Sequence, residues 1–329
     1  MVSRKWFVLI LICMALALPA IGQTITGYNN PTGFGSTNLS ITGTEMAVSA
    51  DGKLALAQDN SKGGATITVY DKAGLGRMAL TTFTAPTGDT FKYISGIAWK
   101  DNDTLVFGEN GDMKTVYSAS LSSNSVARLA SIGSFSNIAQ IALRPSDQMI
   151  FALLANGPGA GAVATLSNGV VSMYATGLGN GYLSGIAFRS DGALFVGDTN
   201  DPNFIGNSGQ ALRINSQGIV VEALSLAGAG GQGCYDIAFN SEGDLFATTG
   251  SNLSLIKNGT TTAQAFGSFT GNYPFPTALE LYGSNLLVNA QWTDVGGLFE
   301  VHPTPEPASL GAALMGAFSL LALRRKAKR

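Results

Sequence analysis

The sequence predicts an all-β protein, a six-bladed β-propeller flanked by an N-terminal signal peptide and a C-terminal transmembrane helix. The first observation is a repeat: an apolar strand, a polar turn with Asp or Gly and a second apolar strand recur six times from Met46 onward. The second is their period, since the first strands are 51, 44, 45, 51 and 42 residues apart, which is typical of propeller blades. The third is that no stretch of the domain keeps a 3.6-residue apolar period, which argues against long helices.

The inner half of each repeat is a hairpin of two strands. It reads MAVSADGKLALAQD from Met46, GIAWKDNDTLVFGE from Gly96, QIALRPSDQMIFAL from Gln140, GIAFRSDGALFVGD from Gly185, DIAFNSEGDLFATT from Asp236 and ALELYGSNLLVNA from Ala278. Three of the turns place Gly after an acidic residue, where glycine accepts the positive φ that a tight hairpin needs. We therefore interpret Asp51, Asp191 and Glu242 as turn residues rather than metal ligands.

The outer half of each repeat supplies two more strands. Third strands begin at Ala65, Thr115, Ala162, Ala211, Leu253 and Leu298, and fourth strands at Met78, Val126, Val170, Ile219 and Thr262. The sixth repeat has no fourth strand of its own, so we expect the β-prone residues 23–27 to supply it. This pairing would close the ring and remove the open sheet edges. Five or seven blades stay open as alternatives, because residues 26–45 leave room for another strand.

The fourth repeat resembles the NHL-type propeller repeat. Its sequence matches that pattern, with a lengthened loop, at Gly185, Asp191, Gly192, Asp198, Asn200, Arg213 and Ile214. The other repeats match only the first half. The resemblance implies the propeller fold and no particular function, because one fold carries many functions.

The N-terminus has the features of a secretory signal peptide over residues 1–22. Arg4 and Lys5 give a positive start, residues 6–18 are apolar, and Ala20-Ile21-Gly22 is a small-x-small cleavage site before Gln23. We therefore expect an exported protein whose propeller domain occupies residues 23–303.

The C-terminal segment, residues 304–329, combines three features in order. Pro305-Glu306-Pro307 precedes an apolar run at 308–323, and a basic tail at 324–329 follows, beginning with Arg324-Arg325-Lys326. Basic residues at the end of an apolar run are retained at the cytoplasmic face of a membrane. The run of 16 residues is shorter than the ~20 that span a bilayer comfortably, which suits a transient transmembrane helix.

This arrangement resembles the PEP-CTERM sorting signal of exported bacterial proteins. The resemblance implies transient insertion in the inner membrane and cleavage near the tripeptide by an exosortase-like transpeptidase. It also implies a final location at the cell surface or in the extracellular matrix of a Gram-negative-type bacterium. It covers about 25 of the 329 residues and concerns sorting alone. The alternative is a permanently anchored type I membrane protein.

The composition of residues 23–303 argues against several kinds of binding and catalytic site. Seven of the 19 basic residues and one of the 21 acidic residues lie in the terminal segments, which leaves residues 23–303 a net charge near −8. Such an acidic domain is not expected to bind nucleic acid. The single histidine, His302, lies beside the sorting segment, so His-dependent catalysis and His metal sites are excluded within the propeller. Cys234 is the one cysteine left after signal removal, and we expect it to be a buried, apolar residue.

Carboxylates and amides remain as candidates for a metal site. Propeller lactonases that resemble gluconolactonase bind a divalent ion through Glu, Asn and Asp at the mouth of the central channel, and hard cations prefer oxygen ligands. Glu45 and Asp236 precede inner strands, and Asn137 and Asn180 lie on neighbouring loops. These four are candidate ligands under an alternative function, a metal-dependent hydrolase or lactonase. The loop 197–201 also has spaced oxygen atoms, and we interpret it as a solvated turn.

Aromatic residues form the other candidate site. Loops on one side of the ring carry Phe91, Tyr93, Tyr182, Tyr235, Tyr273, Phe275 and Trp292. Such rings can stack on sugar faces, and each can equally cap the core. The function expected first is therefore non-enzymatic: a rigid exported ring that binds an extracellular polysaccharide or an envelope protein, without a cofactor. The metal-dependent hydrolase, with a divalent cation, is the alternative.

Overall fold

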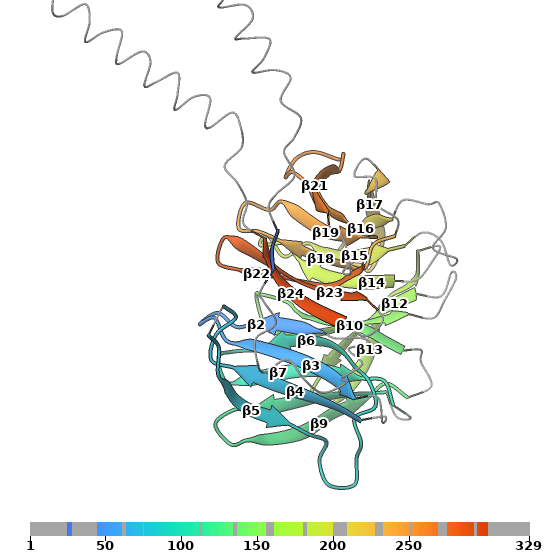
Figure 1. Cartoon of the computed structure of the whole chain (residues 1–329). Coiled ribbons are helices and arrows are strands. Elements are labelled where there is room, and N and C mark those ends of the chain that lie inside the picture. Colours follow the sequence, from blue (N-terminus) through green and yellow to red (C-terminus); the bar gives the residue numbers. More distant parts are fainter. Residues whose placement is uncertain are drawn as a thin grey trace, which may run out of the picture.

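The structure, a computed structural model, describes residues 25–27 and 45–301, except 61–63, 75, 112–113, 134–136, 156–160, 180–182, 200–208, 228–232, 251, 269–274 and 293–294. These residues form six sheets of four antiparallel strands, arranged as the blades of a propeller (Figure 1). The colours in Figure 1 run from the blue blade 1 round to the red blade 6, which lies beside it. The predicted all-β, six-bladed fold is therefore confirmed.

The blades follow the chain order. Blade 1 contains β2 (Met46–Val48), β3 (Leu54–Asn60), β4 (Gly64–Tyr70) and β5 (Ala79–Phe83), and blade 2 contains β6 (Ile94–Trp99), β7 (Thr104–Glu109), β8 (Thr115–Ser120) and β9 (Ser125–Ser131). Blade 3 contains β10 (Asn137–Leu143), β11 (Ile150–Ala155), β12 (Gly161–Ser167) and β13 (Val170–Leu178). Blade 4 contains β14 (Leu183–Phe188), β15 (Leu194–Asp198), β16 (Gln210–Ile214) and β17 (Val220–Ser225). Blade 5 contains β18 (Asp236–Phe239), β19 (Leu245–Thr249), β20 (Asn252–Ile256) and β21 (Gln264–Ser268).

Blade 6 is built from both ends of the chain. It contains β22 (Phe275–Tyr282), β23 (Asn285–Trp292), β24 (Val295–Val301) and, as its outer strand, β1 (Ile25–Gly27). Ile25 pairs with Val301, Thr26 with Glu300 and Gly27 with Phe299, so β1 runs antiparallel to β24. The N-terminal segment thus supplies the missing outer strand, as predicted from the sequence, and β24 is hydrogen-bonded on both sides.

Tight turns join the first and second strands of the blades. Gly52, Gly192 and Gly243 have φ values of 88°, 84° and 82°, the left-handed conformation expected for them. Two of the acidic turn residues, Asp191 and Asp51, pair with a base in the same turn. Arg189 Nη2 lies 2.6 Å from Asp191 Oδ2, and this hydrogen bond lowers the pKa of the Asp191 carboxyl to about 2. Asp51 forms the corresponding ion pair with Lys53.

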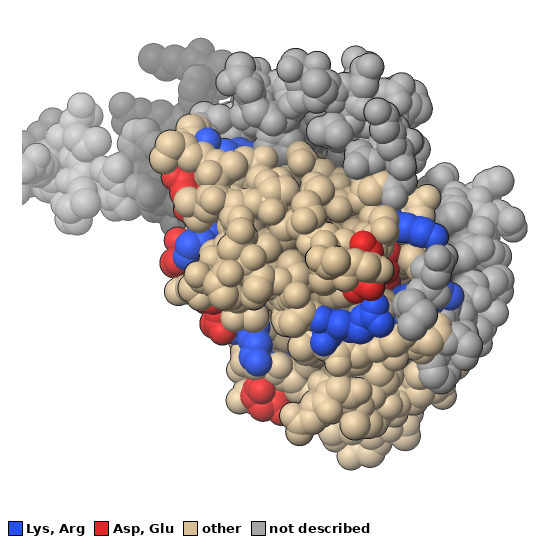
Figure 2. Space-filling view, turned by 90° about the horizontal axis from the view of Figure 1, so that it is seen from below, with Lys and Arg blue, Asp and Glu red and all other residues tan. Residues whose placement is uncertain are grey.

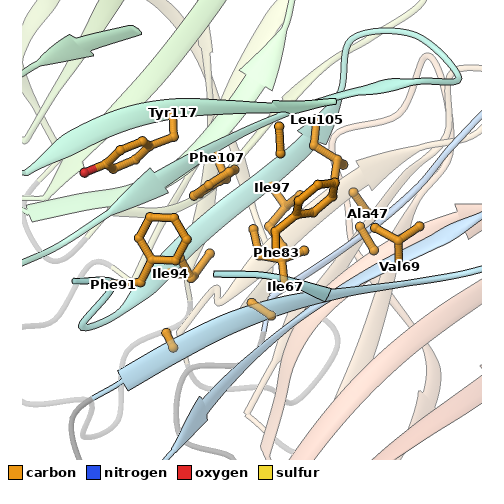
Figure 3. Close-up of a cluster of buried hydrophobic side chains, with 14 residues drawn as sticks. Ala47, Ile67, Val69, Phe83, Phe91, Ile94, Ile97, Leu105, Phe107 and Tyr117 are labelled. Carbon is orange, nitrogen blue, oxygen red and sulfur yellow. The ribbon is translucent and has the colours of Figure 1, made fainter. Parts of the chain in front are cut away.

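A hydrophobic cluster fills each of the six junctions between neighbouring blades. Figure 3 shows the cluster between blades 1 and 2, which includes Phe83 of β5, Phe107 of β7 and Tyr117 of β8. The ring of Phe91 meets those of Phe107 and Tyr117 edge-on, at centroid distances of 5.3 and 5.2 Å. Aromatic pairs in this geometry add to the free energy of burial, and they fix the angle between the two blades.

The ring has two faces that differ in their connections. We call the hairpin face the side on which turns join the first to the second strand of each blade. The loop face is the opposite side, where chains enter the inner strands and where second strands connect to third strands. Tyr282, at the turn of blade 6, contacts the hairpin turn of blade 1 at Gly52, with a distance of 3.6 Å to an ideal Cβ there.

The predicted signal peptide and sorting segment lie outside the described residues. These segments include Pro305, Glu306, Pro307, Arg324, Arg325 and Lys326. In the part of the chain that the structure describes, no helix is long and apolar enough to cross a membrane.

Candidate functional site

Six equivalent positions lie on or next to the inner strands, one before the residue that aligns each repeat. They are Glu45, Gly96, Gln140, Gly185, Asp236 and Ala278. Blades 1, 3 and 5 carry a polar side chain at this position, whereas blades 2, 4 and 6 carry glycine or alanine. The six-fold repeat therefore has a three-fold pattern of polar side chains at its centre.

Asp236 and Gln140 meet across the channel from blades that are not neighbours. Gln140 Nε2 of blade 3 donates to Asp236 Oδ1 of blade 5 over 2.8 Å. Each side chain also accepts a hydrogen bond from a backbone amide of the next blade. Ile186 N donates to Gln140 Oε1, and Leu279 N donates to Asp236 Oδ2 over 2.7 Å. The Ile237 amide donates to Asp236 Oδ1 over 2.8 Å. This network joins blades 3, 4, 5 and 6 around the axis.

The small residues of the alternate blades allow neighbouring inner strands to approach closely. An ideal Cβ on Gly185 would lie 2.6 Å from Ile237 N and 2.8 Å from Asp236 Cα. On Gly96 it would lie 2.2 Å from Ile141 N of the next blade. Both contacts are with backbone atoms, which cannot move aside as a flexible side chain can. Glycine at these positions therefore brings the polar side chains of blades 3 and 5 to the axis.

Glu280 breaks the repeat two residues further along β22. The equivalent residue is alanine in all five other blades: Ala47, Ala98, Ala142, Ala187 and Ala238. Three of these alanines, Ala47, Ala142 and Ala238, are buried, and Glu280 is half-buried at the same place on the inner edge of blade 6. Sequence analysis did not identify Glu280 or Gln140 as site residues. The signal was present in the aligned repeats, where Glu280 is the only residue at its position that is not alanine.

The carboxyl groups of Asp236 and Glu280 both have raised pKa values, close to neutral pH. Burial raises the pKa of Asp236 to about 7, although the amide donors from Gln140, Leu279 and Ile237 stabilise its charged form. Burial, together with the negative charge of Asp236, raises the pKa of Glu280 to about 8. The backbone amide of Leu281 donates to the Glu280 carboxylate and lowers its pKa. A carboxyl group with a pKa near 7 or 8 can gain and lose a proton at physiological pH.

Three of the four predicted metal ligands lie among the described residues and have different environments. Asp236 is hydrogen-bonded to Gln140, which is in the middle of β10, so Asp236 does not lie at the channel mouth. Its two oxygens accept hydrogen bonds from three N–H groups. Glu45 is half-buried at the equivalent position of blade 1, Asn137 is exposed at the start of β10, and Asn180 lies outside the described residues. Calcium takes about six to eight oxygen ligands. The described residues contain no group of three or more His, Cys, Asp or Glu side chains that could hold a metal ion. A cation site that includes Asn137 and Asn180 stays a prediction, because Asn180 lies outside the described residues.

The end of β15 and Cys234 are both buried, and Cys234 belongs to the cluster between blades 4 and 5. Asp198 and Thr199 are 0 % and 2 % exposed, so the interpretation of this loop as a solvated turn was wrong for its first residues. Gln210 Nε2 donates to Asp198 Oδ2 over 3.0 Å, which stabilises the carboxylate away from water. Cys234 is fully buried, as predicted, and burial raises the pKa of its thiol. A thiol in this state is a packing group rather than a nucleophile.

The aromatic residues predicted to form a binding face have different environments. Phe91 is 1 % exposed and belongs to the core cluster of Figure 3, so it cannot contact a ligand. Tyr93 is 57 % exposed, and Tyr235 is half-buried. Tyr182 and Tyr273 lie outside the described residues, as do the side chains of Phe275 in β22 and Trp292 in β23. Among the described rings, Tyr93 alone is an exposed aromatic of the predicted face.

Comparison with known proteins identifies similar folds. Neither a protein-family model nor a curated protein matches this chain. A solved gluconolactonase from Xanthomonas campestris, described as important in glucose secondary metabolic pathways, is 14 % identical with a TM-score of 0.57, and the match covers 81 % of this chain and 87 % of that one. A calcium-binding protein, regucalcin, from Agrobacterium tumefaciens is 14 % identical with a TM-score of 0.53, covering 80 % and 90 %.

These matches correct the first functional prediction. A non-enzymatic module that binds a polysaccharide or protein was expected first, without a cofactor, but similar propellers include an enzyme and a calcium-binding protein. The findings therefore contradict the non-enzymatic prediction and agree better with the alternative, a metal-dependent propeller hydrolase or lactonase. At 14 % identity the likeness establishes the fold, and the chemistry of this chain depends on its own channel residues.

Proposed function

We propose that this protein is an exported propeller hydrolase that opens cyclic esters, with Glu280 as its acid–base residue. The observation that carries the proposal is Glu280 itself, an ionisable side chain beside the channel where the other five blades have alanine. The fold does not need an acid at this position. A residue that departs from its repeat and has a pKa moved toward neutrality is a candidate for catalysis.

The reaction follows from the chemistry of one carboxylate. Glu280 removes a proton from water as the water oxygen attacks the carbonyl carbon of the lactone. The bond between that carbon and the ring oxygen then breaks, and Glu280 returns the proton to the departing alkoxide, which leaves a hydroxy acid. Asp236 does not touch the substrate in this scheme. Burial of Glu280 is the main cause of its raised pKa, and the negative charge of Asp236 adds to it, which makes the carboxylate a stronger base.

The likeness to a gluconolactonase supports a sugar lactone as the substrate class. The likeness to a calcium-binding propeller supports a test for a cation, although the described residues hold no group of three or more His, Cys, Asp or Glu side chains that could bind one. No step in the scheme passes through a metal. Dependence on calcium is instead one of the measured outcomes.

The test is hydrolysis of a panel of aldonolactones, followed by proton release, with Glu280→Gln as the main variant. We expect the variant to lose about 10²–10⁴-fold in rate, the usual contribution of a general acid–base residue. Glu242→Gln is the matched control, because Glu242 is an exposed acid in a hairpin turn. Each protein is assayed with calcium and with a chelator. No hydrolysis under either condition, or an undiminished rate in Glu280→Gln, would contradict the proposal.

The second part of the proposal concerns sorting. We propose that residues 1–22 are removed as a signal peptide and that residues 304–329 act as a PEP-CTERM-like sorting segment, recognised by an exosortase-like transpeptidase. The propeller would then reach the cell surface or extracellular matrix after transient insertion in the inner membrane. The support is the order of Pro305-Glu306-Pro307, the apolar run and the basic tail. Mass spectrometry of the protein from its native host tests this, with a C-terminus near Glu306 expected. An intact Arg329 on the surface protein would instead indicate a permanent type I anchor.

A further inference from the structure

The outer edges of blades 3 and 4 carry a group of exposed aliphatic side chains. Val170 and Met173 lie on β13 of blade 3, and Ile219, Val220 and Val221 lie at the start of β17 of blade 4. The largest exposed fractions are 62 % for Val170, 59 % for Ile219 and 53 % for Val221. The two blades are neighbours in the ring (Figure 1). We call these five residues the rim patch.

The two halves of the rim patch are connected by a contact between β13 and the turn before β17. Tyr174 Oη donates to Asn215 O over 2.7 Å, and an ideal Cβ on Gly218 would overlap the carbonyl oxygen of Tyr174. Met173 and Ile219 are each one residue away from this contact, so their Cα atoms are at most about 13 Å apart. With the strand residues on either side, the whole patch spans at most about 30 Å.

The fold does not require aliphatic side chains at this edge. One position on the outer edge, opposite the end of the third strand, is occupied in blades 1 to 4 by Met78, Ser125, Val170 and Ile219. Blade 2 has an exposed serine there, and it separates the rim patch from the exposed Met78 and Leu80 of blade 1. An aliphatic side chain that stays in water adds little to stability. A continuous exposed apolar patch indicates an interaction surface instead.

The exposed charges around the rim patch are arranged in pairs. Arg213 Nη1 lies 3.6 Å from Glu222 Oε2, and Glu222 directly follows Val221 of the patch. Residues 148–188, which include β13, contain no Asp, Glu, Lys or Arg. The other ion pairs of the two blades are Arg144 with Asp147 and Arg189 with Asp191.

Three further acids belong to these blades or to the next one. Asp198 is buried, Asp201 lies outside the described residues, and Glu242 is exposed in the hairpin turn of blade 5. Arg189 lies beside that turn, because its Cδ is 3.4 Å from an ideal Cβ on Gly243. The propeller domain as a whole has a net charge near −8, so two copies repel each other through most of their surfaces. The rim patch, with its paired charges, is a place where two copies can approach without strong repulsion.

From these observations we propose that the rim patch is the contact surface of a homodimer, in which blades 3 and 4 of two copies meet across a two-fold axis. A two-fold contact uses the same surface on both copies. Arg213 and Glu222 at the edge of the patch are complementary to themselves in such a contact, because the rotation places each acid opposite the base of the second copy. An interface of standard size buries about 800 Å² on each partner, an area about 30 Å across, which matches the extent of the patch. The contact leaves the loop face of both copies open.

The test measures the molar mass of the full chain in detergent micelles at micromolar concentration, by size-exclusion chromatography with light scattering. Ile219→Glu puts two like charges into the contact and should weaken the dimer about tenfold or more. Leu80→Glu is the matched control, because Leu80 is also an exposed aliphatic residue of an outer strand, at 52 %. Figure 2 views the molecule from the side of β5, which contains Leu80, and acidic and basic side chains lie on that surface. We expect the parent chain and Leu80→Glu to be dimers and Ile219→Glu to be a monomer.

A charge-reversal pair tests the two-fold arrangement. Arg213→Glu leaves two acids at the edge of the patch and Glu222→Arg leaves two bases, so each protein alone should be monomeric. An equal mixture should form a dimer with one chain of each kind. Mixing cannot repair an ion pair that acts only within one chain, so a mixed dimer requires contact between the copies.

Three results would overturn the proposal. They are a monomeric parent chain, equal effects of Ile219→Glu and Leu80→Glu, and a mixture of the two charge-reversal chains that stays monomeric. All the proteins keep the same C-terminal segment, so a difference between them cannot come from association through that segment. Val170→Glu is a second patch variant and should behave like Ile219→Glu. Circular dichroism melts of each variant confirm that the propeller is folded.

Discussion

Replacing Glu280 by alanine is expected to stabilise this protein at pH 8 and to have a small effect at pH 5. The carboxyl pKa is about 8 in the folded chain and 4.5 ordinarily. Between these values the folded state binds more protons than the unfolded state, so stability falls as pH rises through that window. The full difference corresponds to about 4 kcal/mol at pH 8 and less than about 1 kcal/mol at pH 5.

The expected gain at pH 8 is smaller than the full difference. Part of the raised pKa of Glu280 comes from the charge of Asp236, which remains in the variant. Removing Glu280 also takes away the methylene groups that it buries at the inner edge of blade 6, which costs about 1 kcal/mol. We therefore expect Glu280→Ala to raise the free energy of unfolding by about 2–3 kcal/mol at pH 8.

The assay is urea denaturation at pH 5 and at pH 8, with lactone hydrolysis measured on the same samples. Glu242→Ala is the control, because Glu242 is exposed and should change stability by less than about 0.5 kcal/mol at either pH. The variant should gain stability only at the higher pH and lose activity. Equal or lower stability of Glu280→Ala at pH 8 would refute the argument, because the charged carboxylate would then cost the fold nothing.

Three further perturbations test the centre of the ring. Gln140→Leu removes the donor to Asp236 and the acceptor for Ile186 N, so urea denaturation should show a loss of about 2–4 kcal/mol, against less than about 0.5 kcal/mol for the exposed Gln217→Leu. Gly185→Ala should cost about 2–4 kcal/mol in the same assay, since its Cβ would lie 2.6 Å from Ile237 N, while Ala278→Gly at the equivalent position should cost about 1 kcal/mol. Cys234 should not react with a thiol reagent in the folded protein and should react fully in urea, because it is buried and its thiol pKa is raised; rapid reaction in buffer would contradict this packing.

Much of the fold could be predicted because each blade repeats the same local chemistry. Apolar strands separated by Asp-Gly turns fix the first hairpin of a blade, and Gly52 and Gly192 adopt the positive φ that the turn signal requires. The closing strand could be predicted by counting, since the sixth repeat lacked one strand and residues 23–27 were β-prone. The observed pairing of Ile25 with Val301 agrees with that count.

The candidate site could not be predicted in the same way, because it depends on contacts between blades far apart in the sequence. Gln140 and Asp236 are 96 residues apart and meet only when the ring closes. Asp236 looked like a free carboxylate before an inner strand, whereas its oxygens accept amides from two neighbouring inner strands and Gln140. Phe91 was predicted to belong to a binding face on the loops, but its ring is buried in the cluster between blades 1 and 2. The sequence shows which residue types are present and where turns occur, whereas the burial of a side chain and its hydrogen-bond partners depend on tertiary packing.

The repeat itself helps to separate structural residues from functional ones. Five blades show that alanine satisfies the fold at the position of Glu280, so the acid there is not explained by folding. A loss of about 2–3 kcal/mol at pH 8 is a large part of the 5–15 kcal/mol that stabilises a typical domain. Blade 6, which bears this cost, is also the blade closed by only three residue pairs between β1 and β24. The proposed role of Glu280 in proton transfer accounts for keeping a carboxyl group there despite this cost, because its raised pKa suits that role.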